Sequence, residues 1–183
     1  MVGTGRGAHA GVLVKDAEAL QLLERVDTLV IDKTGTLTEG RPRLVDIEIL
    51  AGFFPADVLA AAAAVEARSE HPLARAVLDA ARDQGVETAE AADFESQTGL
   101  GVSGVVGGRT VVVGNAAQME RVGVDAAPLS FAAERHRGTG AGTMLVAIGG
   151  RLAGLLVVTD PVKEIGRPGD RRTARGRAAD RHA

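Results

Sequence analysis

The chain has 183 residues, a formal net charge of −3, four Phe as its only aromatic residues, and no cysteine. This length predicts one or two domains, and the lack of cysteine excludes disulfides, thiolate metal sites and cysteine nucleophiles. The lack of Trp and Tyr argues against a ligand base stacked on an aromatic ring. The apolar runs are much shorter than the roughly 20 residues of a membrane-spanning helix, so we expect the chain by itself to be soluble.

The first predicted elements are a helix and a strand. Apolar residues recur at helical spacing within residues 17–23, and the apolar run Thr28–Ile31 indicates a buried strand. A polar loop containing glycine follows, so Asp32 is expected at the C-terminal end of that strand. Open α/β sheets bind their ligands at this position.

The middle of the chain predicts alternating strands and helices. A strand over Leu44–Leu50 is followed by an Ala-rich helix from Pro55 to about Arg68. A second helix is expected from about Pro72 to Gln84, with Ser69 as its cap and Gly85 past its end. The remaining expected elements begin with short strands within Phe94–Gly114, separated by glycine pairs such as Gly107-Gly108 that suit a hairpin turn. A short helix from Asn115 to about Arg121 follows, and then two strands within Thr143–Thr159 joined at Gly149-Gly150.

The strongest functional signal is the string Asp-Lys-Thr-Gly-Thr-Leu-Thr over residues 32–38. A preset string of this length arises by chance in such a chain with odds on the order of one in ten million. The string resembles the phosphorylation motif of P-type ATPases. The resemblance implies that Asp32 is the nucleophile that takes the γ-phosphate of ATP. It also implies that Lys33, Thr34 and Thr36 belong to the catalytic motif, with the Thr34 carbonyl and Asp32 holding Mg²⁺ and Thr36 donating to the phosphoryl oxygens.

A related class, the haloacid-dehalogenase-like phosphatases, shares this fold but usually carries a second Asp two residues after the nucleophile. Here that position is Thr34. Without a neighbouring carboxylic acid to activate water, the phospho-enzyme is expected to persist long enough to drive a conformational step. The substitution therefore favours a pump over a phosphatase.

A second signal is Ser-Glu-His-Pro-Leu over residues 69–73, preceded by Glu66. It resembles the SEHPL motif of the heavy-metal branch of P-type ATPases, in which the His and the upstream Glu face the adenine of ATP. Taken by itself, His71 is better explained as a partly exposed residue at a helix start. Together with the Asp32 motif, the resemblance implies that Glu66 and His71 contact the nucleotide.

Two weaker signals lie further along the chain. Gly99-Leu100-Gly101 resembles the glycine turn that lies over the nucleotide in the same family, although hairpin turns use the same residues. Gly114-Asn115 resembles the family's nucleotide-contacting GN segment, but Asn115 reads just as well as a helix N-cap. Asp160 to Lys163 is similar to the family's D-x-x-K hinge.

The resemblance covers about residues 3–164 and implies an α/β fold. An α+β nucleotide-binding domain (43–150) would be inserted into an incomplete Rossmann-like, haloacid-dehalogenase-like phosphorylation domain. That second domain would comprise residues 1–42 and a return strand over 151–164. Residues 165–183 carry six Arg and two Asp without apolar periodicity, which predicts a disordered tail. Nucleic-acid binding by this tail is not expected, because no aromatic or folded scaffold lies beside it in the sequence.

The implied function is ATP-driven export of a transition metal, with copper as the leading guess, through an aspartyl-phosphate and with ATP and Mg²⁺ as cofactors. The intact parent would act at the cytoplasmic face of the cell membrane, with membrane helices and a metal cation as partners, and this chain alone would be soluble and cytoplasmic. The chain lacks the TGD and GDGxND segments of complete pumps, so we expect nucleotide binding with little or no turnover. The alternatives are a non-catalytic ATP-binding module and a vestigial or regulatory fragment whose basic tail binds anionic partners.

Overall fold

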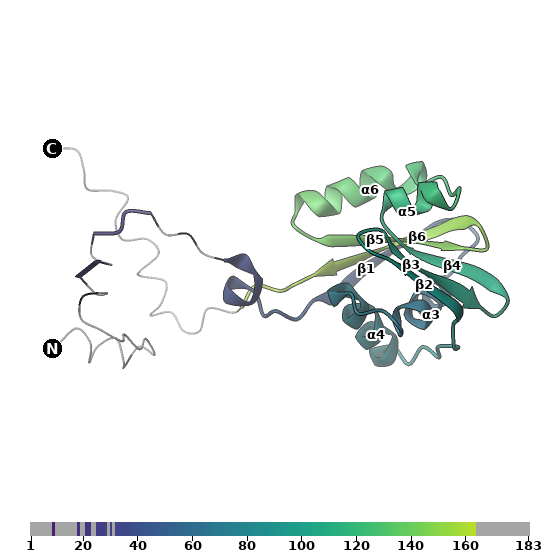
Figure 1. The fold of residues 1–183 in the computed structure, drawn as a ribbon, viewed down its shortest axis with the longest axis horizontal. Coiled ribbons are helices and arrows are strands. Elements are labelled where there is room, and N and C mark those ends of the chain that lie inside the picture. The colour runs from purple at the N-terminus through teal and green to yellow at the C-terminus, as the bar shows by residue number, and fades with distance from the viewer. Residues whose placement is uncertain are drawn as a thin grey trace. The chain divides into compact units, whose positions relative to one another are not determined.

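A computed structural model of the chain describes residues 9, 18, 21–22, 25–28, 30 and 32–163 (Figure 1). The chain divides into two units, residues 1–32 and 33–183. The second unit contains all of the helices and strands described below. Most of the predicted helix within residues 17–23 lies outside the described residues. The Arg-rich tail lies outside them entirely.

The second unit is built on a six-stranded antiparallel sheet in the order β1-β6-β5-β4-β3-β2. Its strands are β1 (Arg43–Ile49), β2 (Ala92–Gln97), β3 (Gly101–Val106), β4 (Arg109–Gly114), β5 (Gly142–Ile148) and β6 (Arg151–Thr159). The predicted glycine turns are confirmed: both residues of Gly107-Gly108 and of Gly149-Gly150 have positive φ and join β3 to β4 and β5 to β6. A two-residue hairpin turn needs this backbone conformation, which glycine adopts without steric cost.

Helices cover both faces of this sheet. Helices α3 (Pro55–Glu66) and α4 (Pro72–Asp83) pack on one face, and α5 (Ala116–Arg121) and α6 (Ala127–Gly138) lie on the other (Figure 1). Neighbouring residues of β6 point to opposite faces, so Leu156 belongs to the core under α3 and α4 while Leu155 belongs to the core under α5 and α6. Because both of its faces are buried, β6 reads as a continuous apolar run rather than as an alternating one.

The position of β6 corrects the predicted domain boundary at residue 150. The segment 151–164 was expected to return into a phosphorylation domain, but Arg151–Thr159 lies inside the sheet, hydrogen-bonded between β1 and β5. Both β1 and β5 form backbone hydrogen bonds along β6. A strand that returned into a separate domain would lose these hydrogen bonds. The chain therefore leaves this sheet only after Thr159.

A short connector, defined as residues 35–41 and 160–163, includes the end of the 32–38 motif and joins it to the sheet. Its two segments pair through a bridge between Thr38 and Val162 and through the Lys163 N–H, which donates to the Leu37 carbonyl at 2.8 Å. The Thr38 hydroxyl donates to the Asp160 carboxylate at 2.5 Å. The predicted hinge segment thus lies directly against the end of the phosphorylation motif.

Several predictions need correction. Helix α4 is capped by His71, not by Ser69, because the His71 Nδ1 accepts from the Leu73 N–H at 3.2 Å while Ser69 Oγ accepts from the His71 N–H. Of the predicted strand over 28–31 the structure describes Thr28 and Val30, which belong to no strand, and Val30 is 92% exposed instead of buried. A buried parallel strand needs partners on its edges, and every strand pair in the described residues belongs to the antiparallel sheet.

The segment after Asp32 is also more regular than predicted. The expected polar loop is a five-residue π-helical turn, η1 (Lys33–Leu37). Gly35 has a φ of +77° within it, and its N–H donates to the Thr38 hydroxyl at 3.0 Å. The motif is therefore held as a compact turn by its own residues.

Candidate functional site

A cleft of about 850 Å³ opens at one end of the sheet, where β4 ends and β5 begins. One wall is the connection between α3 and α4, and another is the turn between β2 and β3. The residues that line it include Glu66, His71, Gly99, Gly101 and Asn115. These are the five residues predicted to bind the nucleotide outside the Asp32 motif, and the fold brings them together from three segments of the chain.

Glu66 is the last residue of α3 and is only 3% exposed. Burial raises the pKa of its carboxyl group, while a hydrogen bond with Ser69 and the charge of His71 oppose that rise. Its Oε2 atom is buried and has no hydrogen-bond partner among the described residues. A buried polar atom of this kind costs free energy unless a partner arrives, so Glu66 is suited to bind a polar group of a ligand.

His71 lies on the same wall of the cleft as Glu66, at the start of α4. Because its Nδ1 accepts the hydrogen bond from the Leu73 N–H, the proton of the neutral imidazole is assigned to Nε2. The cap orients the ring, and the ring presents an N–H donor and a flat face. A neutral imidazole of this kind can lie against a purine in a cleft that has no Trp or Tyr.

The glycine turn is pinned to the start of α5. The Asn115 side chain donates from Nδ2 to the Gly99 carbonyl at 2.8 Å, and its backbone N–H donates to the Leu100 carbonyl at 2.9 Å. Gly101 pairs with Gly114 at the end of β4, and the two backbones lie so close that a Cβ atom at Gly101 would be 2.1 Å from the Val113 carbonyl oxygen. The backbone of the turn is therefore held at the cleft without an intervening side chain.

Asn115 is also the N-cap of α5, since its Oδ1 accepts from the Gln118 N–H at 3.0 Å. Both ends of its side-chain amide are engaged by the protein. Its N-cap role is thus observed, and its contact with a nucleotide stays a prediction.

The residues of the phosphorylation motif belong to a different part of the structure. Asp32 is exposed and is assigned to the first unit, whereas the cleft lies in the second. Thr36 is an exposed residue of η1, and the side chains of Lys33 and Thr34 lie outside what is described. The cleft does not include this motif, so the roles of Asp32, Lys33, Thr34 and Thr36 stay predictions.

Arg137 and Thr143 are two polar residues among the cleft residues that sequence reasoning missed. Arg137 is in the last turn of α6, and its Nε donates to the Thr143 hydroxyl at 3.0 Å. Helix α6 was not predicted because only Leu129 and Ala133 of its residues are buried, which leaves too weak an apolar periodicity to detect. A basic residue three positions before the glycine at 140 was the signal available in the sequence.

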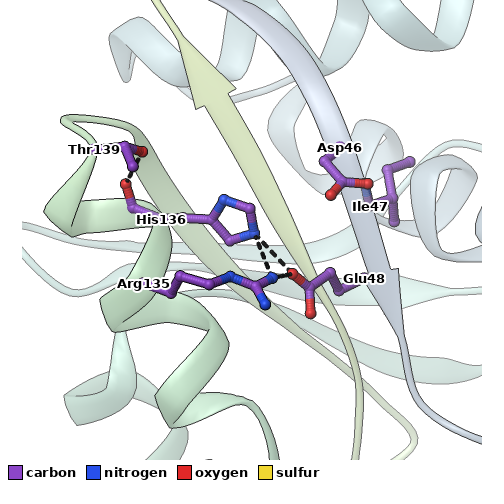
Figure 2. Close-up of polar contacts among 6 residues, drawn as sticks. All are labelled: Asp46, Ile47, Glu48, Arg135, His136 and Thr139. Atoms are coloured by element: carbon purple, nitrogen blue, oxygen red, sulfur yellow. Dashed lines mark hydrogen bonds and ion pairs between the residues drawn. The ribbon is translucent and has the colours of Figure 1, made fainter.

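A separate polar cluster ties α6 to β1, away from the cleft (Figure 2). Ligand atoms of Asp46, Glu48 and His136 lie within 4.8 Å of one another, a composition that can hold a metal ion. However, Glu48 Oε1 already binds the Arg135 guanidinium at 2.6 Å and His136 Nε2 at 2.7 Å. The arginine supplies the positive charge that a cation would bring, so the arrangement is that of an ion-pair cluster joining a helix to an edge strand.

Comparison with known proteins gives a consistent result. A family model described as haloacid dehalogenase-like hydrolase matches residues 26–165. The chain is 50% identical over 163 residues to a copper-exporting P-type ATPase of Legionella pneumophila, which covers 89% of the chain and 22% of that protein. It is 45% identical over 163 residues to a silver exporting P-type ATPase of Salmonella typhimurium, covering 89% of the chain and 20% of that protein.

Solved structures show the same likeness. A zinc-transporting PIB-type ATPase in its E2.Pi state superposes with a TM-score of 0.73 at 29% identity, covering 88% of the chain and 26% of that structure. The N-domain of a copper-transporting P-type ATPase superposes with a TM-score of 0.56 at 26% identity, covering 65% of the chain and 99% of that structure. The chain spans about a fifth of the length of the curated relatives it matches. Among the described residues, no helix has both the length and the apolar character needed to cross a bilayer.

Proposed function

This chain belongs to the haloacid dehalogenase-like hydrolase family, and from that premise we propose that it is the ATP-binding and phosphorylation segment of an ATP-driven metal-cation transporter. The cleft beside Glu66 and His71 binds the nucleotide, and Asp32 accepts its γ-phosphate. The observation that carries the proposal is the convergence of Glu66, His71, Gly99, Gly101 and Asn115 in one cleft. The sheet that forms this cleft follows the 32–38 motif in the chain, and the segment after its last strand pairs with the end of that motif.

The cleft suits an adenine ring and the sugar attached to it. Glu66 offers a buried carboxyl group in need of a partner, and His71 offers an Nε2 donor and a flat imidazole face. The glycine turn lets backbone groups approach the ligand without a Cβ in the way. These groups bind through hydrogen bonds and ring contact, so the cleft does not need an aromatic platform.

The phosphoryl step uses the Asp32 carboxylate as nucleophile. One of its oxygens forms a bond to the γ-phosphorus, the bond from that phosphorus to the bridging oxygen breaks, and ADP leaves. The Asp32 carboxylate and the Thr34 carbonyl are hard oxygen ligands of the type that Mg²⁺ prefers, and Mg²⁺ bound there would offset the charge of the phosphate. Because residue 34 is Thr and not Asp, no second carboxylate next to the nucleophile activates water, and the phospho-enzyme persists.

The transported ion is proposed from the relatives. Those named as copper-exporting or silver exporting P-type ATPases support a soft transition-metal cation, with copper first. In the intact transporter this segment would work at the cytoplasmic face of the membrane, with membrane helices that carry the metal.

The proposal is tested by ATP titration and by phosphorylation of the 183-residue chain. The chain is incubated with Mg²⁺ and ATP labelled at the γ-phosphate, quenched in acid, and treated with hydroxylamine, which cleaves acyl-phosphates. Label that is lost in Asp32→Asn but retained in Asp27→Asn, an exposed neighbour outside the motif, would support the proposal. Failure of the folded chain to bind ATP would overturn it.

Binding at the predicted cleft is tested with His71→Asn. Asparagine keeps the N-cap acceptor of α4 but removes the imidazole. We expect weaker ATP binding with an unchanged melting temperature. Unchanged affinity would remove His71 from the nucleotide site.

A non-catalytic ATP-binding module is the second candidate. It is favoured by the lining of the cleft, which includes no residue of the 32–38 motif. Under this candidate the chain binds ATP, His71→Asn weakens that binding, and no hydroxylamine-sensitive label appears on Asp32.

A further inference from the structure

The cleft has an uneven distribution of charge. Glu66 and Glu70 line it, and Arg137 is the only Lys or Arg among its lining residues, all of which belong to the described range 32–163. A nucleotide polyphosphate carries several negative charges and needs donors that are positively charged or aligned with its oxygens. Arg137 is thus the cleft residue with the chemistry to meet the phosphate end of a nucleotide.

The Arg137 guanidinium is held in place by two neighbours. Its Nε donates to the Thr143 hydroxyl at 3.0 Å, and its Nη1 donates to Glu134 Oε1 at 2.6 Å. These bonds use two of the five N–H donors of an arginine. The Arg137 and Glu134 side chains are 46% and 70% exposed, and an ion pair this exposed contributes little stability. The guanidinium can therefore exchange Glu134 for a phosphate while Thr143 keeps its orientation.

The register of the sheet places Arg137 on the connector side of the cleft. Its partner Thr143 pairs with Val157 of β6, and Gly142 pairs with Val158. Asp160, two residues after Val158, binds Thr38 at the end of the phosphorylation motif. A nucleotide bound with its base between Glu66 and His71 and its phosphates beside Arg137 would point its γ-phosphate toward the connector.

We propose that Arg137 binds the polyphosphate of the nucleotide and makes this cleft prefer ATP and ADP over adenosine. This inference rests on the proposed function and deepens it, because it names the side chain that binds the phosphates of the nucleotide. The competing explanation is that Arg137 only complements the helix dipole at the C-terminus of α6.

Arg135 provides a matched control. It lies two residues away in the same last turn of α6, and it also makes an exposed ion pair, with Glu48. It is absent from the cleft lining and faces the cluster on β1 (Figure 2). Arg135→Ala therefore removes the same charge and the same dipole interaction as Arg137→Ala, without changing the cleft.

The experiment measures the affinity of the 183-residue chain for adenosine, AMP, ADP and ATP by calorimetry at low ionic strength, without Mg²⁺. Arg137→Ala, Arg137→Lys and Arg135→Ala are measured alongside the unaltered chain. For Arg137→Ala we expect ATP affinity to fall by about tenfold or more, the size of a lost charge-assisted hydrogen bond, with adenosine affinity unchanged. Arg137→Lys should recover part of the loss, and Arg135→Ala should bind each ligand as the unaltered chain does.

Each outcome decides between the explanations. An unchanged ratio of ATP to adenosine affinity in Arg137→Ala, or an equal loss in Arg135→Ala, would overturn this inference and leave the proposed function standing. An equal loss of affinity for adenosine and for ATP would show that Arg137 shapes the cleft instead of binding phosphate, and would also overturn it. If the unaltered chain bound none of the four ligands, the proposed function would fail together with the inference.

Discussion

The glycine turn offers a sharp test of the cleft geometry through two alanine substitutions in one loop. A Cβ at Gly101 would lie 2.1 Å from the Val113 carbonyl oxygen and 2.5 Å from the Gly114 Cα. Carbon and carbonyl oxygen ordinarily meet at about 3.3 Å or more, so the clash exceeds what bond angles absorb. Both obstructing atoms belong to the backbone of β4, and they can move only if the pairing of β3 with β4 opens at that end.

Gly99 is the matched control, because a Cβ there meets no atom within 4 Å. Its φ of +75° makes alanine strained by about 1–2 kcal/mol, but nothing has to move. We expect Gly101→Ala to lower the free energy of unfolding by about 3 kcal/mol or more, the upper end of overpacking costs. Gly101 has a φ of +154°, which also strains alanine, so the difference between the two substitutions measures the close approach together with any difference in backbone strain.

The assay is urea unfolding followed by far-ultraviolet circular dichroism, because the chain has no Trp or Tyr for intrinsic fluorescence. ATP affinity is measured on both variants under folding conditions. Gly101→Ala should also bind ATP more weakly, since the turn is displaced from the cleft. Equal unfolding midpoints for the Gly99 and Gly101 variants would refute the close backbone contact between Gly101 and β4.

Three further predictions concern other parts of the second unit. Burial raises the pKa of Glu66 above its ordinary 4.5, so the stability from this group is fully present below that pH and is lost as pH rises through the folded pKa. Glu66→Gln should therefore flatten the fall of the melting temperature above pH 4.5, and an unchanged slope would contradict the burial effect. Asp160→Ala removes the bonds from the Thr38 hydroxyl and the Arg41 N–H; hydrogen exchange at Arg41 should accelerate while global stability falls by only about 1 kcal/mol. Leu156→Ala, at a side chain with 0% exposure, should cost about 2–5 kcal/mol in urea unfolding, and a loss below 1 kcal/mol would count against the core assignment.

Much of the site was predictable because its signals are local in the chain. The motif beginning at Asp32 and the Glu66–His71 pair are contiguous or nearly so, and the family that they resemble agrees with the comparisons. Hairpin turns such as Gly107-Gly108 were also predicted, since positive φ at both residues is a property of the turn itself. The Ala-rich α3 followed from its composition and from Pro55 in its first turn.

The features missed by sequence reasoning depend on contacts between distant residues. β6 reads as a strand in any context, but its place between β1 and β5 is set by hydrogen bonds to residues more than a hundred positions away in the case of β1. The close contact of Gly101 with the Val113 carbonyl and the presence of Arg137 in the cleft also depend on residues that are distant in the sequence. Neither leaves a periodic trace in the sequence.

The sequence by itself therefore supplied the chemical predictions for this protein: which residues are candidates to bind a nucleotide, which carboxylate is the candidate to accept a phosphate, and where the chain turns. Only the tertiary structure decided which of these residues share a cleft, where the sheet ends, and which arginine lines that cleft. The physical reason is that backbone conformation and motif spacing depend on neighbours along the chain. Strand order and cleft lining, by contrast, depend on the burial of apolar faces from segments that meet only in the folded state.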